Sequence, residues 1–109
     1  MDDALRLLVD HREDLVAERT RIISRLRWHL HELHPGWAPP TKIDRTSAFD
    51  TVTAHVEAHR DNALVHRLAL RLVEHLRMLT IEIDELAAEI TERVTIVAPS
   101  LLAISAAAR

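Results

Sequence analysis

The residues best suited to chemistry form a basic run in the first third of the chain: Arg19, Arg21, Arg25, Arg27 and Trp28. No acidic residue lies between Arg19 and His31. Arginine neutralises phosphates and tryptophan stacks on bases, so this run is a candidate nucleic-acid-binding surface. A solvated helix end, where cations suit the helix dipole, explains the same residues, and both interpretations stay open.

Three histidines, His29, His31 and His34, follow this run. Two ligands on one helix face need i, i+3 or i, i+4 spacing, which His31 and His34 have and His29 does not share. Histidines near a helix C-terminus also favour the local dipole, and we prefer that explanation. The chain has no cysteine, which excludes disulfides and thiolate sites. We therefore predict no metal site and no cofactor.

Five acidic residues occur within eleven positions of the last third: Glu82, Asp84, Glu85, Glu89 and Glu92. A paired-carboxylate active site needs two carboxylates that face inward in a pocket. Apolar residues occupy the inward face here, so we expect these acids to point to solvent. The sequence therefore predicts no catalytic residue.

Arg12 and Arg19 lie on the apolar face of the first predicted helix. If a later helix folds back antiparallel, Arg12 comes near Glu82, Glu85 and Glu89. We expect a structural ion pair that sets the register between the two helices.

The composition sets the fold class that must position these residues. Of 109 residues, 48% are hydrophobic but only 3% aromatic, with one glycine and a net charge of −3. Few turn residues and many helix formers predict an all-α fold. No apolar run is long enough to span a membrane, and the acidic N-terminus does not match a signal peptide. We therefore expect a cytoplasmic protein with no membrane partner.

The apolar spacing predicts two long antiparallel amphipathic helices and a short middle helix, in a coiled-coil-like, dimeric arrangement. Within a helical coiled-coil domain of residues 1–98, the predicted elements are helix 3–34, loop 35–45, helix 46–59 and helix 61–97, and residues 99–109 form a truncated tail. Asp2 or Asp3 caps the first helix, and Ser47 with Asp50 forms a capping box on the second. Trp37 covers an apolar helix end, and Pro99 ends the third helix.

The third predicted helix carries eight apolar positions that alternate spacings of four and three: Val65, Ala69, Leu72, Leu76, Leu79, Ile83, Leu86 and Ile90. Such a heptad seam is typical of two-stranded coiled coils. A soluble monomer does not leave so long a seam exposed, so we expect a homodimer built on it.

The stretch REDLVAERTR, residues 12–21, resembles a segment of the DEDD-type, Piv-like insertion-sequence transposases, which are guided by a bridge RNA. The similarity continues in order and spacing through nearly the whole chain, at Arg25-Leu26, Leu30, Pro35-Gly36, Ile83-Asp84-Glu85-Leu86, Ala88-Glu89-Ile90 and residues 98–104.

In that family a helical coiled-coil region joins a nuclease domain to a domain with a nucleophilic serine. The resemblance implies that this chain is the joining region alone: non-catalytic, dimerising, and with DNA and guide RNA as partners of a full-length relative. It implies no small-molecule substrate. The family continues with a glycine-containing turn where Ser105–Arg109 stands here. We therefore expect a natural remnant or a trimmed fragment.

Two alternatives remain. One is a stand-alone nucleic-acid-binding helical module that uses the basic run. The other is an enzyme, because the plan of three helices in an intertwined dimer is similar to that of the all-helical chorismate mutases. Their sites need several inward cations, including a lysine. Arg12 and Arg19 could serve, but Lys42, the one lysine, falls in the proline-rich loop.

Overall fold

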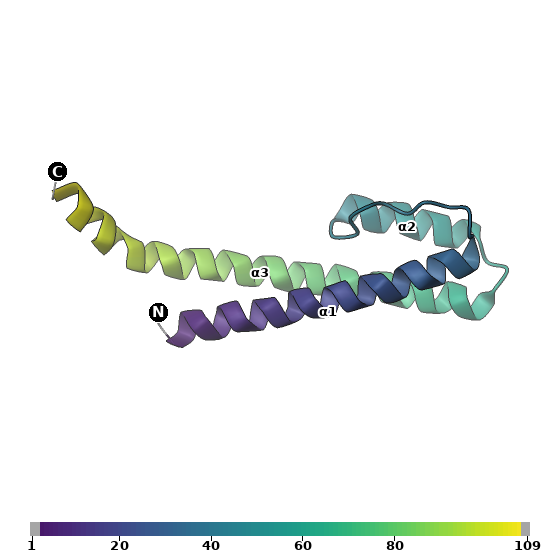
Figure 1. The fold of residues 1–109 in the computed structure, drawn as a ribbon, viewed down its shortest axis with the longest axis horizontal. Helices are drawn as coiled ribbons and strands as arrows, with labels where there is room; N and C mark the ends of the chain where they lie inside the picture. Colours follow the sequence, from purple (N-terminus) through teal and green to yellow (C-terminus); the bar gives the residue numbers. More distant parts are fainter. Residues whose placement is uncertain (1–2, 108–109) are drawn as a thin grey trace.

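The computed structural model describes the backbone of residues 3–107 and the side chains of residues 3–96. It contains three helices in the order α1 (Asp3–Leu33), α2 (Thr46–Ala58) and α3 (Ala63–Ala107), and no strand within this described part. The long helices α1 and α3 run antiparallel side by side, and α2 packs against α3 near one end of the hairpin (Figure 1). The all-α prediction is confirmed, with two long helices and a short one between them.

The first helix ends where the sequence changes from helix formers to Pro35 and Gly36. The amide of His34 still donates to the carbonyl of Leu30 at 3.0 Å, and the amide of Trp37 closes a turn on the carbonyl of His34 at 3.1 Å. At the other end Asp3 lies in the first turn, where its charge suits the helix dipole. Asp2, the other predicted cap, lies outside the described residues.

The predicted capping box on α2 is wrong. Arg45 is the N-cap residue, and no side chain caps this helix end. Ser47 lies inside the first turn, where its carbonyl accepts the hydroxyl of Thr51 at 2.9 Å. Asp50 accepts a hydrogen bond from Arg77 of α3 at 2.7 Å. The Asp50 carboxylate, which the capping box required, therefore forms an ion pair with another helix instead.

The third helix starts later and extends further than predicted. Asn62 caps it, because its side-chain oxygen accepts the amide of Val65 at 3.2 Å. The predicted end at residue 97 is not observed, since α3 continues through Pro99 to Ala107. A proline inside a helix displaces the carbonyl four residues earlier, and helices accommodate it by bending. Figure 1 shows α3 curving away from α1 near this end.

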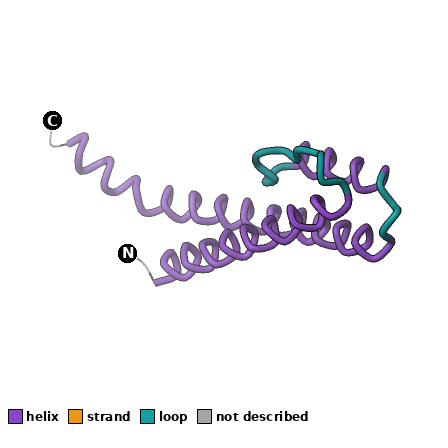
Figure 2. The backbone as a smooth tube through the Cα atoms, turned by 45° about the vertical axis from the view of Figure 1, so that its right-hand side comes forward, coloured by secondary structure: helices purple, strands orange, loops and turns teal. Residues whose placement is uncertain are grey.

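The hydrophobic core lies where all three helices meet, which we call the closed end (Figure 2). Fourteen buried residues form it: Leu15, Ile22, Leu26, Leu30, Ile43, Ala48, Phe49, Val52, Val56, Ala69, Val73, Leu76, Leu79 and Ile83. Half of the predicted seam is therefore buried inside the chain. The other four seam residues, Val65, Leu72, Leu86 and Ile90, are half-buried.

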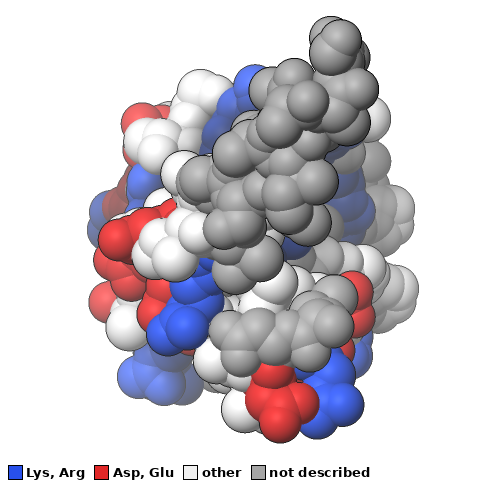
Figure 3. All heavy atoms as spheres, turned by 90° about the vertical axis from the view of Figure 1, so that its left-hand side faces the viewer, with Lys and Arg blue, Asp and Glu red and all other residues white. Residues whose placement is uncertain are grey.

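The opposite end of the hairpin, which carries both termini, consists of α1 and α3 alone. We call its described part, residues 3–14 and 84–96, the open half. None of these residues reaches the burial of the core. Seen from this end, acidic and basic side chains are interspersed over the visible described surface (Figure 3). The charge here favours neither a purely anionic nor a purely cationic partner.

Truncation of Leu76 tests the position of the core. Its side chain is 0% exposed, so Leu76→Ala leaves a cavity and should lower the free energy of unfolding by about 2–5 kcal/mol in chemical denaturation. Leu64→Ala is the matched control on the same helix. Leu64 is 54% exposed, so its truncation should change stability by less than about 0.5 kcal/mol. Equal losses for the two variants would contradict the described core.

Candidate functional site

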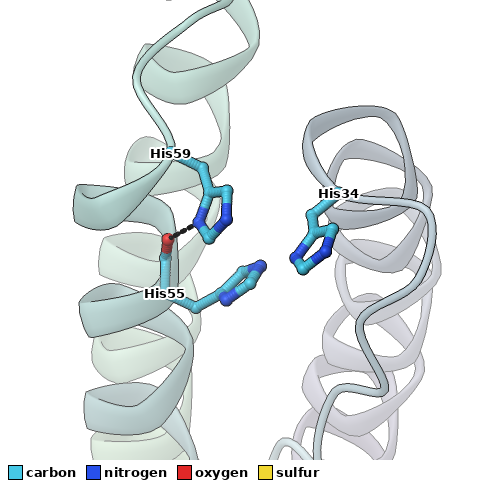
Figure 4. A group of neighbouring side chains, drawn as sticks. All are labelled: His34, His55 and His59. Carbon is cyan, nitrogen blue, oxygen red and sulfur yellow. Dashed lines mark hydrogen bonds between the residues drawn. The ribbon is translucent and has the colours of Figure 1, made fainter.

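The structure brings together three histidines from the ends of two helices. His34 follows the last residue of α1, His55 lies in the last turn of α2, and His59 is the C-cap residue of α2. One nitrogen from each ring lies within 4.8 Å of the other two. Figure 4 shows His34 facing the two α2 histidines across the gap between the helices. Within the described residues this is the one group of metal-ligating side chains that gathers so closely.

The histidine rings of this cluster stack on one another and on Trp37. The rings of His34 and His55 lie 5.2 Å apart and nearly parallel, and those of His34 and His59 lie 4.8 Å apart. Trp37 stacks on His55 with ring centroids 3.7 Å apart. Because Trp37 also packs against the core, it connects the cluster to the apolar interior, as its predicted covering role requires.

Hydrogen bonds fix one ring and leave the other two unsatisfied. Nδ1 of His59 lies 2.8 Å from the carbonyl oxygen of His55. A carbonyl only accepts, so Nδ1 of His59 carries the proton, and the lone pair of the neutral ring is on Nε2. Nδ1 of His34 and Nε2 of His55 are buried without a protein partner. A buried nitrogen without a partner costs about 1–3 kcal/mol, so the cluster favours a ligand that satisfies these atoms.

Burial lowers the pKa of His55 from the ordinary value of 6.5, and the neighbouring His59 and His34 lower it further. Burial disfavours the charged imidazolium, and a proton on either neighbour repels a second one. His55 therefore stays neutral at pH values where an exposed histidine begins to charge, and neutral imidazole is the form that binds metals.

The spacing of His31 and His34 at the end of α1 would allow them to act as a ligand pair, but the structure separates their side chains. His31 is exposed beside Trp28, with ring centroids 6.5 Å apart, while His34 turns toward α2. His55 and His59 were not among the candidate residues, although they have the i, i+4 spacing on a helix that was considered for the α1 histidines. The third ligand depends on how the loop after α1 returns, which helical periodicity does not predict.

The predicted nucleic-acid-binding run divides into two groups. Arg27 donates to the carbonyls of Pro40 and Thr41, at 3.1 and 2.7 Å, and so holds the loop against α1. Arg19 donates to the hydroxyl of Thr80 at 3.5 Å. The other three residues, Arg21, Arg25 and Trp28, are exposed on one face of α1.

Lys42 lies near two of the arginines, although it belongs to the proline-rich loop. It lines an open groove of about 280 Å³ together with Arg19 and Arg27. Asp44 lines the same groove, so the cations share it with a carboxylate. Arg12, the other cation required by the chorismate mutase comparison, does not line it and lies near Ala87 and Ile90 instead.

The predicted register ion pair is also absent. Within the described residues Arg12 forms no ion pair with Glu82, Glu85 or Glu89, and its Nε is buried without a partner. The reason is the orientation of α3, which turns these three acids outward. All five acids of the predicted cluster (Glu82, Asp84, Glu85, Glu89 and Glu92) are exposed, which confirms that they face solvent.

Comparisons of the chain with protein-family models, with curated proteins and with solved structures gave no match. No helix within the described residues combines the length and apolar character needed to cross a membrane.

The lowered pKa of His55 predicts a pH dependence of stability. In the unfolded chain His55 takes up its proton near 6.5, whereas the folded protein resists protonation until a lower pH. The unfolded state thus binds more protons in this window, so stability is complete above 6.5 and falls as the pH drops below it. Thermal unfolding in the presence of a chelator should show a lower melting temperature at acidic pH. His55→Gln should flatten this dependence, and an unchanged slope in the variant would contradict the assignment.

Proposed function

We propose that this chain is a non-catalytic self-association module, in which two copies pair through their open halves. The observation that carries the proposal is the absence of a third helix over residues 3–14 and 84–96. The radius of gyration is 19.5 Å, against about 13 Å for a compact chain of this length. The molecule measures 67 × 25 × 15 Å, too elongated for one chain to cover its own apolar surface.

The exposed area supports the same conclusion. The chain exposes 7480 Å², whereas a compact monomer of 12.4 kDa exposes about 6,100 Å². The excess of about 1,300 Å² exceeds the roughly 800 Å² that each partner buries in a standard interface. A standard interface with one further copy would therefore remove more than half of this excess.

The groove of the open half has the chemistry expected for pairing with itself. It has a volume of about 300 Å³ and is lined by Val9, Arg12, Glu13, Ala87, Ile90 and Thr91. One cation and one anion lie in it, and a two-fold axis can place each opposite its counterpart in the partner. Val94, on the same face of α3, is 45% exposed. Two such halves packed together form a four-helix bundle with a buried seam.

We further propose that the module works in DNA transposition, as the helical linker of a DEDD-type transposase. The support is the residue resemblance together with the antiparallel hairpin, which suits a spacer between two larger domains. In a full-length relative, DNA and guide RNA are the partners.

A second candidate function, nucleic-acid binding, is favoured by one observation. Arg21, Arg25 and Trp28 occupy one exposed stripe of α1, and neither arginine forms an ion pair. Two free guanidinium groups beside an indole that is 62% exposed match a surface for phosphates and a stacked base.

Self-association is tested by light scattering and sedimentation at micromolar protein concentrations. We expect a dimer whose thermal stability rises with concentration. Val94→Asp should dissociate it, because Val94 lies on the groove face. The chain itself tolerates this change, since the side chain is already partly exposed.

Ile81→Asp is the matched control. Ile81 is also exposed, at 59%, but it lies beside Thr46 and Phe49 of α2 and does not line the groove. The control should remain dimeric. A wild-type monomer with concentration-independent unfolding would refute the module, and dissociation by Ile81→Asp alone would place the interface elsewhere.

Nucleic-acid binding is tested by fluorescence anisotropy with a labelled single-stranded oligonucleotide. We expect weak binding at low salt that is lost near physiological salt, because two arginines neutralise few phosphates. Replacement of Arg21 and Arg25 by alanine should abolish it. Replacement of Arg67 and Arg71, an exposed pair with the same spacing on α3, is the control for net charge. Equal losses in the two double variants would show that no specific surface exists.

A further inference from the structure

We propose that His34, His55 and His59 bind a divalent transition-metal ion of the zinc class at the closed end. Three imidazoles are a common ligand set for such ions, with a water or small anion completing a tetrahedron. The ligand nitrogens, within 4.8 Å of one another, are near the spacing that coordination requires. Metal–nitrogen bonds of about 2.0–2.1 Å place tetrahedral ligands about 3.3 Å apart, so the rings need to approach by about 1.5 Å or less.

Rotation of the side chains supplies this approach. The stacked rings present their faces to one another, whereas a metal needs the ring edges, so the rings of His34 and His55 must turn. No hydrogen bond opposes this motion, since Nδ1 of His34 and Nε2 of His55 have no protein partner. Coordination would satisfy buried nitrogens that otherwise remain unpaired.

His59 is already arranged as a metal ligand. Its Nδ1 donates to the carbonyl of His55, which leaves Nε2 as the coordinating atom. Metal-bound histidines commonly donate their second nitrogen to a carbonyl or carboxylate in this way. The same contact satisfies one of the free carbonyls at the end of α2, so the folding of this helix end prepares the ligand.

The backbone around the cluster favours a cation. The C-terminal ends of α1 and α2 both meet there, at Leu33 and Ala58. Each helix end carries about half a negative charge from its unpaired carbonyls. A bound metal would also connect the end of α1 to the end of α2 across the loop. This site is independent of the open half and of the proposed self-association.

The test uses a tag-free chain of residues 1–109 that has been stripped of metal with a chelator. Titration with Co²⁺, followed by visible absorption, should saturate at one ion per chain with the intense bands of a tetrahedral site. Zn²⁺ should displace the cobalt and raise the melting temperature. His55→Gln and His59→Gln should each weaken binding by about tenfold to a hundredfold or more, since even loss of an outer-shell contact has such effects.

Two histidines outside the cluster provide the controls. His31→Gln removes the pair expected from spacing, and His66→Gln removes a ring that lies 3.4 Å from Glu57 near the same end. Both should bind Co²⁺ as the wild type does. Circular dichroism checks that each variant is folded, and His59→Gln provides the test if His55→Gln unfolds. If the folded wild-type protein bound no Co²⁺, the metal site would be refuted and the cluster would be a stack of rings with a purely structural role. One ion per two chains, or equal losses in the controls, would assign the metal to surface histidines.

Discussion

The apolar packing between α1 and α3 is the constraint on which the rest of the structure depends. Leu26, Leu30 and Leu76 are almost wholly buried where the two helices meet α2. This packing fixes the antiparallel register, and the register fixes where α1 stops and where the chain must turn. The loop then has to return along α1, which places α2 over the seam and Trp37 over His55. The histidine cluster is therefore a consequence of where two apolar helices end.

The two ends of the hairpin bury apolar surface by different means. At the closed end Phe49, Val52 and Val56 of α2 supply a third layer, so the chain completes its own core. In the open half the same seam continues through Leu86 and Ile90 with no third layer above it. Apolar burial stabilises by about 25 cal/mol per Å², so leaving this seam half-exposed forgoes several kcal/mol. A second copy is the simplest source of the missing layer, which links the asymmetry of the fold to the proposed function.

Periodic features could be predicted from the sequence, and features that depend on tertiary contacts could not. The spacing of Leu72, Leu76, Leu79 and Ile83 correctly predicted a helix and the face that it turns inward. Such a prediction is possible because apolar residues recur with the helical period on the side that is buried. Ser47 and Asp50 matched the local pattern of a capping box, but in the structure the Asp50 carboxylate accepts a hydrogen bond from Arg77 of α3. Pro99 did not end α3, because a helix can continue past a single proline by bending at that point. His34 has its neighbours 21 and 25 residues away, at His55 and His59, and no local rule spans that distance.

The arginines along the inner edge of the hairpin have fewer hydrogen-bond partners towards the open half, where side chains are also less buried. Near the closed end Arg27 has two carbonyl partners in the loop. Midway, Arg19 has one long hydrogen bond to Thr80. In the open half the Nε of Arg12 is buried without any partner. A buried guanidinium nitrogen is costly to leave unpaired, so the position that lacks a third helix also lacks a polar partner. The chain itself already shields this Nε, so a second chain across the groove would instead cover the apolar seam and contact the outer part of Arg12, which lines the groove.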